Sequence, residues 1–160
     1  MAWTLLLAAG QGNRLASATG GLAKQFLDWK GAPLYWESAL VFSRCARVEG
    51  LVFVFPEACI DEERERVAGL MRNASLGIPW KVVAGGALRQ DSVRNGLSAL
   101  PDDCMEVLIH DAARPFVSPV LVNRILDGLH GEASGECVAA RVISPRWPIR
   151  AWATASMPCR

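Results

Sequence analysis

Short apolar runs of strand length alternate along this chain with longer segments in which apolar residues recur at helical spacing. The runs lie at 3–8, 51–55, 80–84, 106–110 and 136–142, and the helical segments at 34–47, 61–73, 90–100 and 119–130. The first two runs contain almost no polar residue, which is typical of parallel strands covered on both faces. Regular alternation of strand and helix predicts an α/β fold, with a doubly wound, mostly parallel sheet and right-handed crossovers.

Residues at the ends of the helical segments support these boundaries. Ser118 is a favoured N-cap, and Pro119 suits a first helical turn, where its missing N–H costs no hydrogen bond. The segment 61–73 begins with acidic residues and ends near Arg72, which is the charge order that the helix dipole favours. Gly96 lies inside the third helical segment, although glycine in a helix costs about 1 kcal/mol relative to alanine.

The last nineteen residues depart from the pattern. They contain three of the nine prolines, two of the six tryptophans, three arginines and no acidic residue. Pro145, Pro148 and Pro158 exclude a long helix or a central strand. We therefore expect one domain over residues 1–141 and an irregular tail over 142–160.

The composition is that of an ordinary globular protein. The chain has 160 residues, of which 51% are hydrophobic, and a formal net charge of +1, so it offers no long-range attraction to nucleic acid or to an anionic membrane. No apolar run reaches the roughly 18 residues of a membrane span, and the first residues lack the charged start of a signal peptide. Five widely spaced cysteines without a C-x-x-C pair indicate reduced thiols rather than disulfides or a zinc site, and we expect a cytoplasmic protein.

Three unusual loops follow predicted strands. They span 10–14, 85–92 and 110–115. In a doubly wound sheet, ligands bind outside the carboxyl ends of the strands. Each loop alone is a weak signal, but their position at the same edge of the sheet predicts one shared binding site.

The first loop has the features of a phosphate site. Gly10 and Gly12 let backbone N–H groups approach an anion, while Arg14 and Lys24 add positive charge. A tight turn with a surface arginine is the alternative. A dinucleotide fingerprint fails because Leu15 occupies its third glycine position and no acid ends the second strand close enough to bind a ribose diol. A P-loop fails because G-K-[ST] is absent. The loop therefore favours a nucleoside triphosphate.

The second loop permits two interpretations. Gly85 and Gly86 allow close approach of the backbone to a ligand, and the Ser92 hydroxyl could then read a flat base. Alternatively, Asp91 and Ser92 cap the helix that follows, a position in which both residue types are favoured.

The third loop contains a candidate metal ligand. Asp111 ends a strand, where an oxygen ligand for Mg²⁺ beside phosphates is expected, but a helix cap or an ion pair with Arg114 is also possible. His110 is expected to be packed and hydrogen-bonded rather than to act as a base. Catalysis by histidine is not indicated.

Four strings, taken together, resemble one enzyme family. They are A-A-G-Q-G-N-R at 8–14, K-Q-F at 24–26, G-G-A-L-R-Q-D-S-V at 85–93 and H-D-A-A-R-P-F at 110–116. They resemble the 2-C-methyl-D-erythritol 4-phosphate cytidylyltransferases of the non-mevalonate isoprenoid pathway, in order, from about residue 3 to 141. The resemblance implies a Rossmann-like nucleotidyltransferase fold with three αβα layers.

The resemblance implies a reaction and a set of site residues. CTP would react with methylerythritol phosphate, a polyol phosphate, to give the cytidine diphosphate derivative and pyrophosphate. Arg14 and Lys24 would be catalytic, and Asp111 would bind Mg²⁺ or another divalent cation. The residues implied for CTP binding are Ala8, Ala9, Gly10, Gly12, Gly85, Gly86, Arg89, Ser92, Ala112 and Arg114, with Gly86 and Ser92 selecting cytosine.

The chain departs from the family at two places. Ala23 replaces the proline that precedes the family's lysine. Beyond about residue 141, the family's D-T strand end, dimerisation arm, T-P-Q motif and second lysine are not found, so the nucleotide-binding domain is expected to lack its C-terminal part. The family is homodimeric, but the arm that forms the dimer is absent here, and we interpret the tail as an out-of-frame read-through.

Two alternative functions remain open at this point. Ribitol-5-phosphate cytidylyltransferase shares the fold and the H-D-A-A-R-P string, so the acceptor alcohol is not determined. A module that binds CTP and Mg²⁺ without turnover is the other alternative. We also expect poor solubility or marginal stability, because missing strands leave an open sheet edge and uncovered apolar surface.

Overall fold

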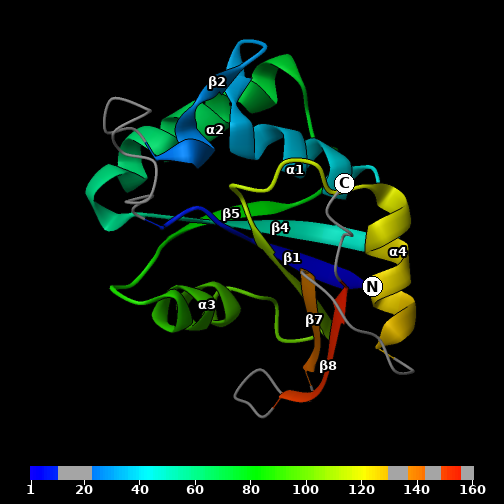
Figure 1. Cartoon of the computed structure of the whole chain (residues 1–160). Coiled ribbons are helices and arrows are strands. Elements are labelled where there is room, and N and C mark those ends of the chain that lie inside the picture. Colours follow the sequence, from blue (N-terminus) through cyan, green and yellow to red (C-terminus); the bar gives the residue numbers. More distant parts are fainter. Residues whose placement is uncertain (11–22, 130–136, 143–148, 156–160) are drawn as a thin grey trace.

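The computed structural model describes residues 1–10, 23–129, 137–142 and 149–155, and all structural statements below refer to these. One sheet has the strand order β5-β4-β1-β6-β7-β8 (Figure 1). The bounds of these strands are β1 (Ala2–Leu7), β4 (Val48–Phe55), β5 (Trp80–Ala84), β6 (Glu106–Asp111), β7 (Cys137–Val142) and β8 (Ile149–Ala155). The helices are α1 (Leu34–Ser43), α2 (Ile60–Asn73), α3 (Arg89–Ser98) and α4 (Pro119–Gly128), with short 3₁₀ turns η1 (Lys24–Phe26) and η2 (Glu57–Cys59).

The sheet is mostly parallel. β5, β4, β1 and β6 pair in parallel, whereas β7 pairs antiparallel with β6 and β8 antiparallel with β7. In Figure 1, α1 and α2 lie on one side of the sheet and α3 lies on the other. This arrangement confirms the predicted three-layer α/β fold.

Alternate residues of the central strands pack into two separate cores. Leu6 and Phe53 belong to the core beneath α1, which also contains the aromatic rings of Tyr35 and Trp36. Leu5 and its neighbours on the other face pack against α3. Both faces of β1 and β4 are therefore buried, which explains why these strands contain almost no polar residue.

Gly96 has a packing role in α3. A Cβ atom at this position would lie 3.0 Å from Leu5 Cδ1 and 3.2 Å from Val54 Cγ2. The absence of a side chain allows α3 to lie close against the sheet. This contact accounts for a glycine in the middle of a helix.

Two elements differ from expectation near the N-terminal half of the domain. α1 ends at Ser43 rather than near residue 47, and β4 begins earlier than predicted, at Val48. A short hairpin, β2 (Asp28–Trp29) and β3 (Ala32–Pro33), was not predicted. Its two turn residues, Lys30 (φ 56°) and Gly31 (φ 83°), both have positive φ, as a tight two-residue hairpin requires.

The expectation of an irregular tail was wrong for residues 149–155. These form β8, which pairs with β7 along the edge of the sheet. Pro145, Pro148 and Pro158 lie outside the described residues and outside β8. A strand fits between the prolines because it is short and because it occupies an edge, as the sequence permitted.

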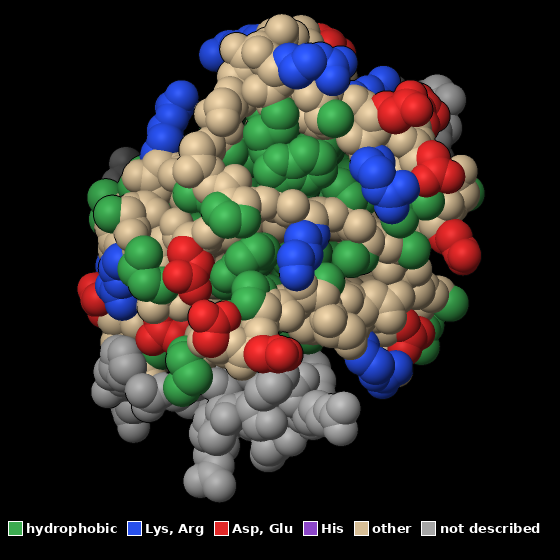
Figure 2. Space-filling view, turned by 180° about the vertical axis from the view of Figure 1, so that it is seen from behind, with side chains coloured by type: hydrophobic (Ala, Val, Ile, Leu, Met, Phe, Trp, Pro, Cys, Tyr) green, Lys and Arg blue, Asp and Glu red, His purple; other side chains and the backbone are tan. Residues whose placement is uncertain are grey.

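The described surface has several exposed large hydrophobic side chains. Phe116 and Val120 are 77% and 69% exposed, and Trp29 is 47% exposed. Figure 2 shows hydrophobic side chains in the middle of one face, with charged side chains around its rim.

No helix in the described segments has the length and apolar character needed to cross a bilayer. Cys45, Cys59 and Cys104 are free thiols, as expected.

Candidate active site

A cleft of about 810 Å³ opens at the carboxyl ends of the parallel strands. The loops that follow β1, β5 and β6 line it, together with the start of η2 after β4. This is the position at which a doubly wound sheet binds its ligands. The described residues of the three loops singled out in the sequence therefore meet at one site.

The first wall of the cleft is the end of β1. The Ala8 N–H donates to the Val54 carbonyl (2.8 Å), which continues the pairing of β1 with β4. The side chain of Gln25, which is buried, approaches from η1, and its Nε2 donates to the carbonyl oxygens of Ala8 (2.7 Å) and Gly10 (2.8 Å). Ala9 and Gly10 face the cleft directly.

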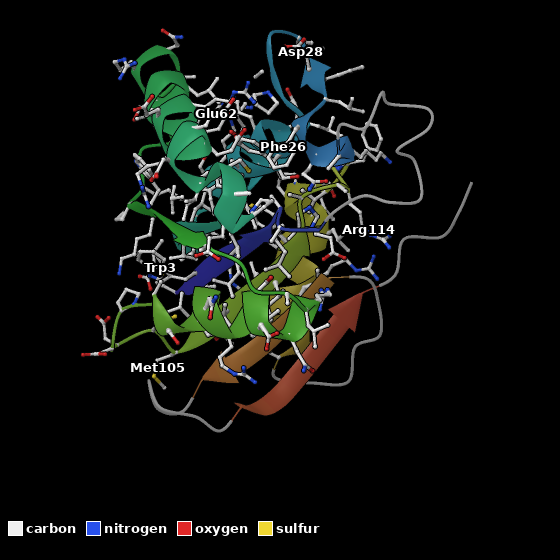
Figure 3. All side chains as sticks on the ribbon, turned by 90° about the vertical axis from the view of Figure 1, so that its left-hand side faces the viewer. Trp3, Phe26, Asp28, Glu62, Met105 and Arg114 are labelled. Atoms are coloured by element: carbon white, nitrogen blue, oxygen red, sulfur yellow. The ribbon has the colours of Figure 1, made fainter. Side chains whose placement is uncertain are left out.

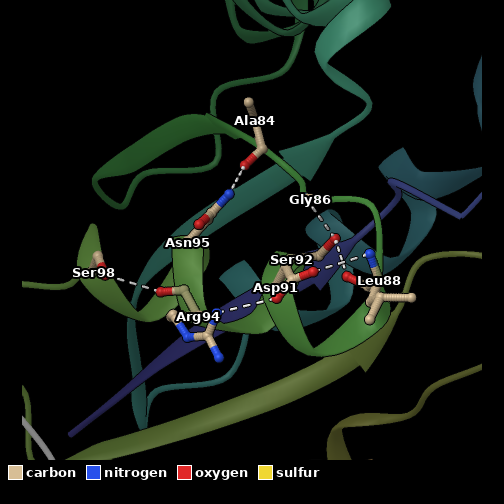
Figure 4. A network of polar contacts seen from close by, with 8 residues as sticks. All are labelled: Ala84, Gly86, Leu88, Asp91, Ser92, Arg94, Asn95 and Ser98. Atoms are coloured by element: carbon tan, nitrogen blue, oxygen red, sulfur yellow. Dashed lines mark hydrogen bonds and ion pairs between the residues drawn. The ribbon is translucent and has the colours of Figure 1, made fainter.

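The second wall is the loop between β5 and α3 (Figure 4). The buried Ser92 hydroxyl accepts a hydrogen bond from the Gly86 N–H (3.1 Å) and donates one to the Leu88 carbonyl (3.3 Å). The Asp91 carboxylate accepts from the Leu88 N–H (3.2 Å) and pairs with Arg94 (3.1 Å). The structure thus gives Asp91 and Ser92 the capping role, and the Ser92 proton is already donated within the loop.

Gly85 is the point at which the first two loops touch. Its N–H donates to the Phe55 carbonyl (2.7 Å). A Cβ atom at position 85 would collide with the Ala9 Cβ and would lie 2.8 Å from Ser92 Oγ. Only glycine leaves both loops in place.

The third wall is the loop after β6. Asp111 Oδ1 pairs with Arg89 Nη2 at 3.2 Å, and Asp111 Oδ2 lies 4.0 Å from Arg114 Nε. Asp111 is 40% exposed, so these pairs are partly solvated. Arg114, which is labelled in Figure 3, follows the end of β6 by three residues. Two arginines and one carboxylate give this wall a net positive charge.

His110 supports the third loop from below. It is buried, its Nε2 lies 2.9 Å from the Arg114 carbonyl and 3.3 Å from Ser38 Oγ, and its ring packs edge-on against Phe42. Burial lowers the pKa of His110 to about 4, so the ring is neutral at physiological pH. The expectation of a packed, hydrogen-bonded histidine is confirmed.

The structure brings most of the predicted site residues together, but not all of them. Those that line the cleft are Ala9, Gly10, Gly85, Gly86, Arg89, Ser92, Asp111 and Arg114. Ala8 and Ala112 are buried beneath it. Lys24 is exposed on η1, next to Gln25. Gly12 and Arg14 lie outside the described residues.

Two polar side chains that line the cleft, Gln25 and Glu57, were missed by the sequence analysis. Gln25 belongs to the K-Q-F string, but only its buried, bridging position in the structure indicates a role. Glu57 follows β4 by two residues and lines the cleft, whereas the sequence analysis found no acid close to the end of that strand. The η2 turn, which begins at Glu57, directs the chain along the cleft after β4 ends at Phe55.

The donor groups in the cleft fit a metal ion that phosphate and water would mainly hold. The described residues contain no cluster of three or more histidine, cysteine or acidic side chains. Asp111 offers a carboxylate beside the loops predicted to bind phosphate, and Glu57 is a second acidic side chain that lines the cleft. Mg²⁺ commonly takes one or two carboxylates and completes its shell with water and substrate phosphates, so a single aspartate is sufficient.

The sheet topology and the cleft place the chain in the α/β nucleotidyltransferase class. More particularly, it belongs to the IspD family, 2-C-methyl-D-erythritol 4-phosphate cytidylyltransferase, whose sequence pattern matches residues 2–147. The match extends beyond residue 141, at which the resemblance in the sequence analysis ended.

Two relatives illustrate the similarity. A bifunctional enzyme IspD/IspF of Oleidesulfovibrio alaskensis is 50% identical over 158 residues, which is 99% of this chain and 40% of that protein. A 2-C-methyl-D-erythritol 4-phosphate cytidylyltransferase of Clostridium botulinum is 37% identical over 74% of this chain and 49% of that protein. The chain therefore spans less than half the length of these relatives.

A solved structure confirms the fold. The 4-diphosphocytidyl-2C-methyl-D-erythritol synthase of Anaerococcus prevotii superimposes with a TM-score of 0.64 at 18% sequence identity. The superposition covers 94% of this chain and 62% of that protein. At this level of identity, the similarity establishes the architecture alone.

Proposed function

We propose that this chain provides the CTP-binding part of a cytidylyltransferase, which transfers CMP from CTP to 2-C-methyl-D-erythritol 4-phosphate in isoprenoid precursor synthesis. One observation carries the proposal: the loops that hold the family's strings converge on a single cleft at the carboxyl ends of the strands. Membership of the family supplies the reaction and its substrates.

The proposed chemistry is an in-line substitution at the α-phosphorus of CTP. An oxygen of the acceptor phosphate forms the new P–O bond, the bond to the β-phosphate oxygen breaks, and pyrophosphate leaves. Negative charge grows on the equatorial oxygens, so the protein contributes mainly position and positive charge. We assign this charge stabilisation to Lys24 and Arg14.

The nucleotide would lie along the two glycine-containing walls. Ala9 and Gly10 offer backbone N–H groups to the triphosphate, while Gly12 would extend this cradle. The base would lie against Gly85 and Gly86. The Ser92 hydroxyl already donates its proton to the Leu88 carbonyl. Ser92 would therefore select cytosine either by accepting a hydrogen bond from the base or by ordering the loop against which the base lies.

The arginines of the third wall would bind phosphate or ribose groups of the nucleotide. Arg89 and Arg114 both face the cleft. A guanidinium can donate two parallel hydrogen bonds to a phosphate. Ala8 and Ala112 would contribute by holding the strand ends beneath these groups.

Asp111 is the residue proposed to hold a Mg²⁺ ion or another divalent cation. Such an ion would neutralise charge on the triphosphate. A bound ion would compete with the Arg89 guanidinium for Asp111 Oδ1. Arg89 would then be free to bind the nucleotide.

The proposal also includes an assembly and a location. By analogy with the family, we propose a cytoplasmic enzyme that acts on small molecules. A homodimer is the corresponding assembly, and sedimentation velocity at several protein concentrations measures it directly.

Two measurements test the proposed function. Calorimetric titration with CTP, ATP and UTP in the presence of Mg²⁺ should show a preference for CTP, and equal affinities for the three would reject it. Pyrophosphate release is then measured with CTP and either methylerythritol phosphate or ribitol 5-phosphate. Release only with ribitol 5-phosphate would reassign the acceptor, and CTP binding without release would indicate a binding module.

A further inference from the structure

We propose that Gln25 is a positioning residue that fixes the peptide groups at the end of β1, within Ala8–Gly10, for the triphosphate. This inference rests on the proposed function and goes one step beyond it. Gln25 is 4% exposed and is one of few buried polar side chains in the described part of the chain. A polar side chain is buried at a cost unless its hydrogen bonds are made, so its partners show what the burial achieves.

Both partners of Gln25 lie directly after β1, which ends at Leu7. The Gln25 Nε2 donates to the Ala8 carbonyl at 2.7 Å and to the Gly10 carbonyl at 2.8 Å. One amide group therefore holds two carbonyl oxygens at the point where β1 ends and the loop begins. Gln25 itself lies at the surface of the cleft.

Holding a carbonyl also orients the N–H on the same peptide group. A trans peptide unit is planar, and its C=O and N–H point in opposite directions. With the Ala8 carbonyl directed to Gln25, the N–H of Ala9 is directed away from Gln25. Within the described part of the chain, the Ala9 N–H donates to no other residue, which leaves it available to an anion.

The element that carries Gln25 is itself held rigidly. Phe26 packs against Tyr35 (ring centroids 6.2 Å apart) and Phe55 (6.1 Å). The Leu27 carbonyl accepts a hydrogen bond from the Leu34 N–H at 2.9 Å, which ties η1 to α1. Because η1 is fixed on the aromatic core, Gln25 can hold the Ala8 and Gly10 carbonyls in a fixed position.

The same residue connects the loop to Lys24. Lys24 precedes Gln25 in η1 and is exposed. Any shift of η1 relative to β1 would move this cation relative to the loop. Gln25 thus sets the distance between two parts of the proposed triphosphate site that are far apart in sequence.

The test uses two variants and a matched control. Gln25→Met keeps the length of the side chain but cannot donate, and Gln25→Glu places a carboxylate against two carbonyl oxygens. Gln90→Met makes the same change at an exposed glutamine of α3. Affinities for CTP, inorganic tripolyphosphate and cytidine are measured by calorimetry with Mg²⁺ present.

A positioning role predicts a loss that is specific to phosphate. Gln25→Met should weaken CTP and tripolyphosphate about tenfold, with cytidine changed by less than about twofold, because the phosphate end alone depends on the loop. Gln25→Glu should weaken tripolyphosphate further and should recover as the pH falls, because a protonated carboxyl can donate again. Gln90→Met should match the wild-type chain.

Several results would overturn the proposal. These are tripolyphosphate binding by Gln25→Met within twofold of Gln90→Met, a parallel loss of cytidine binding, or no tripolyphosphate binding by the wild-type chain. If both variants fail to fold, amide hydrogen exchange of the wild-type chain decides: tripolyphosphate should protect Ala9 and Gly10, and no protection rejects the idea. A wild-type chain that binds tripolyphosphate but shows no preference for CTP would reject the proposed function alone.

Discussion

The end of β1 and the loop between β5 and α3 are held in place in opposite ways. The loop between β5 and α3 is held by its own side chains, since Ser92 and Asp91 bond to backbone groups only a few residues away. The end of β1 is held by Gln25, which lies 15 residues beyond Gly10 in the sequence. The loop between β5 and α3 is therefore ordered by local hydrogen bonds, whereas the end of β1 depends on correct docking of η1.

The largest expected effect comes from Gly85, at which the two loops touch. Gly85→Val should abolish CTP binding and should destabilise the fold by about 1–3 kcal/mol, because its side chain collides with Ala9 and Ser92. Thermal unfolding and calorimetric titration measure the two effects. Gly69→Val, on α2, is the control, since a Cβ atom there meets only an arginine end at 3.5 Å. Equal behaviour of the two variants would contradict the close contact.

The third loop, supported by buried His110, should be sensitive to pH. The folded-state pKa of His110, about 4, lies below the unfolded value of 6.5, so the unfolded chain binds more protons between these two pH values. The contribution of neutral, buried His110 to the free energy of unfolding is complete above pH 6.5. It falls as the pH drops towards 4, by about 3 kcal/mol in total. Denaturant unfolding from pH 7 to pH 4 is compared with His110→Asn. A variant with the same pH dependence as the wild-type chain would refute this assignment.

Two of the hydrogen bonds that order the second loop depend on a single atom, Ser92 Oγ. Ser92→Ala deletes the hydroxyl that bonds to Gly86 and Leu88, and we expect a loss of about 1–2 kcal/mol in the free energy of unfolding. Urea titration gives the value. Ser98→Ala is the control, because that hydroxyl bonds to one carbonyl at the exposed end of α3. A loss in Ser92→Ala no greater than in the control would place the order of the loop elsewhere.

The smallest effect on stability should come from the pair of Arg89 and Asp111. Both side chains are largely solvated, so Arg89→Met should change the free energy of unfolding by less than about 1 kcal/mol. CTP affinity should nevertheless fall about tenfold if Arg89 binds the nucleotide. Arg94→Met, which breaks a comparable pair with Asp91, is the matched control. An equal affinity in the two variants would remove Arg89 from the site.

The sequence predicted the sheet and the location of the cleft because both depend on local patterns. Apolar runs in β1 and β4 and the glycines that follow strands are visible without any long-range information. Contacts between distant residues were not predictable. Gln25 and Ala8 meet only after η1 docks at the end of β1, and Glu57 reaches the cleft only through η2.

The tail shows the same limit of sequence reasoning. Its prolines correctly excluded a central strand, but an edge strand between them depends on whether β7 is available for pairing. The turn of the β2–β3 hairpin was missed for a different reason. Lys30 adopts a positive φ that lysine rarely shows, and its Lys-Gly turn lacks the asparagine or aspartate that marks such hairpins.

The close approach of α3 to the sheet at Gly96 has an electrostatic consequence. α3 begins at Arg89, which lines the cleft, so the positive end of the helix dipole is directed towards the cleft. Asp91 neutralises part of that field inside the first turn. A methyl group at position 96 would push on Leu5 and Val54 and would shift the helix by a few tenths of an ångström. The field felt by a bound anion would then change, although no residue that touches the anion had been altered.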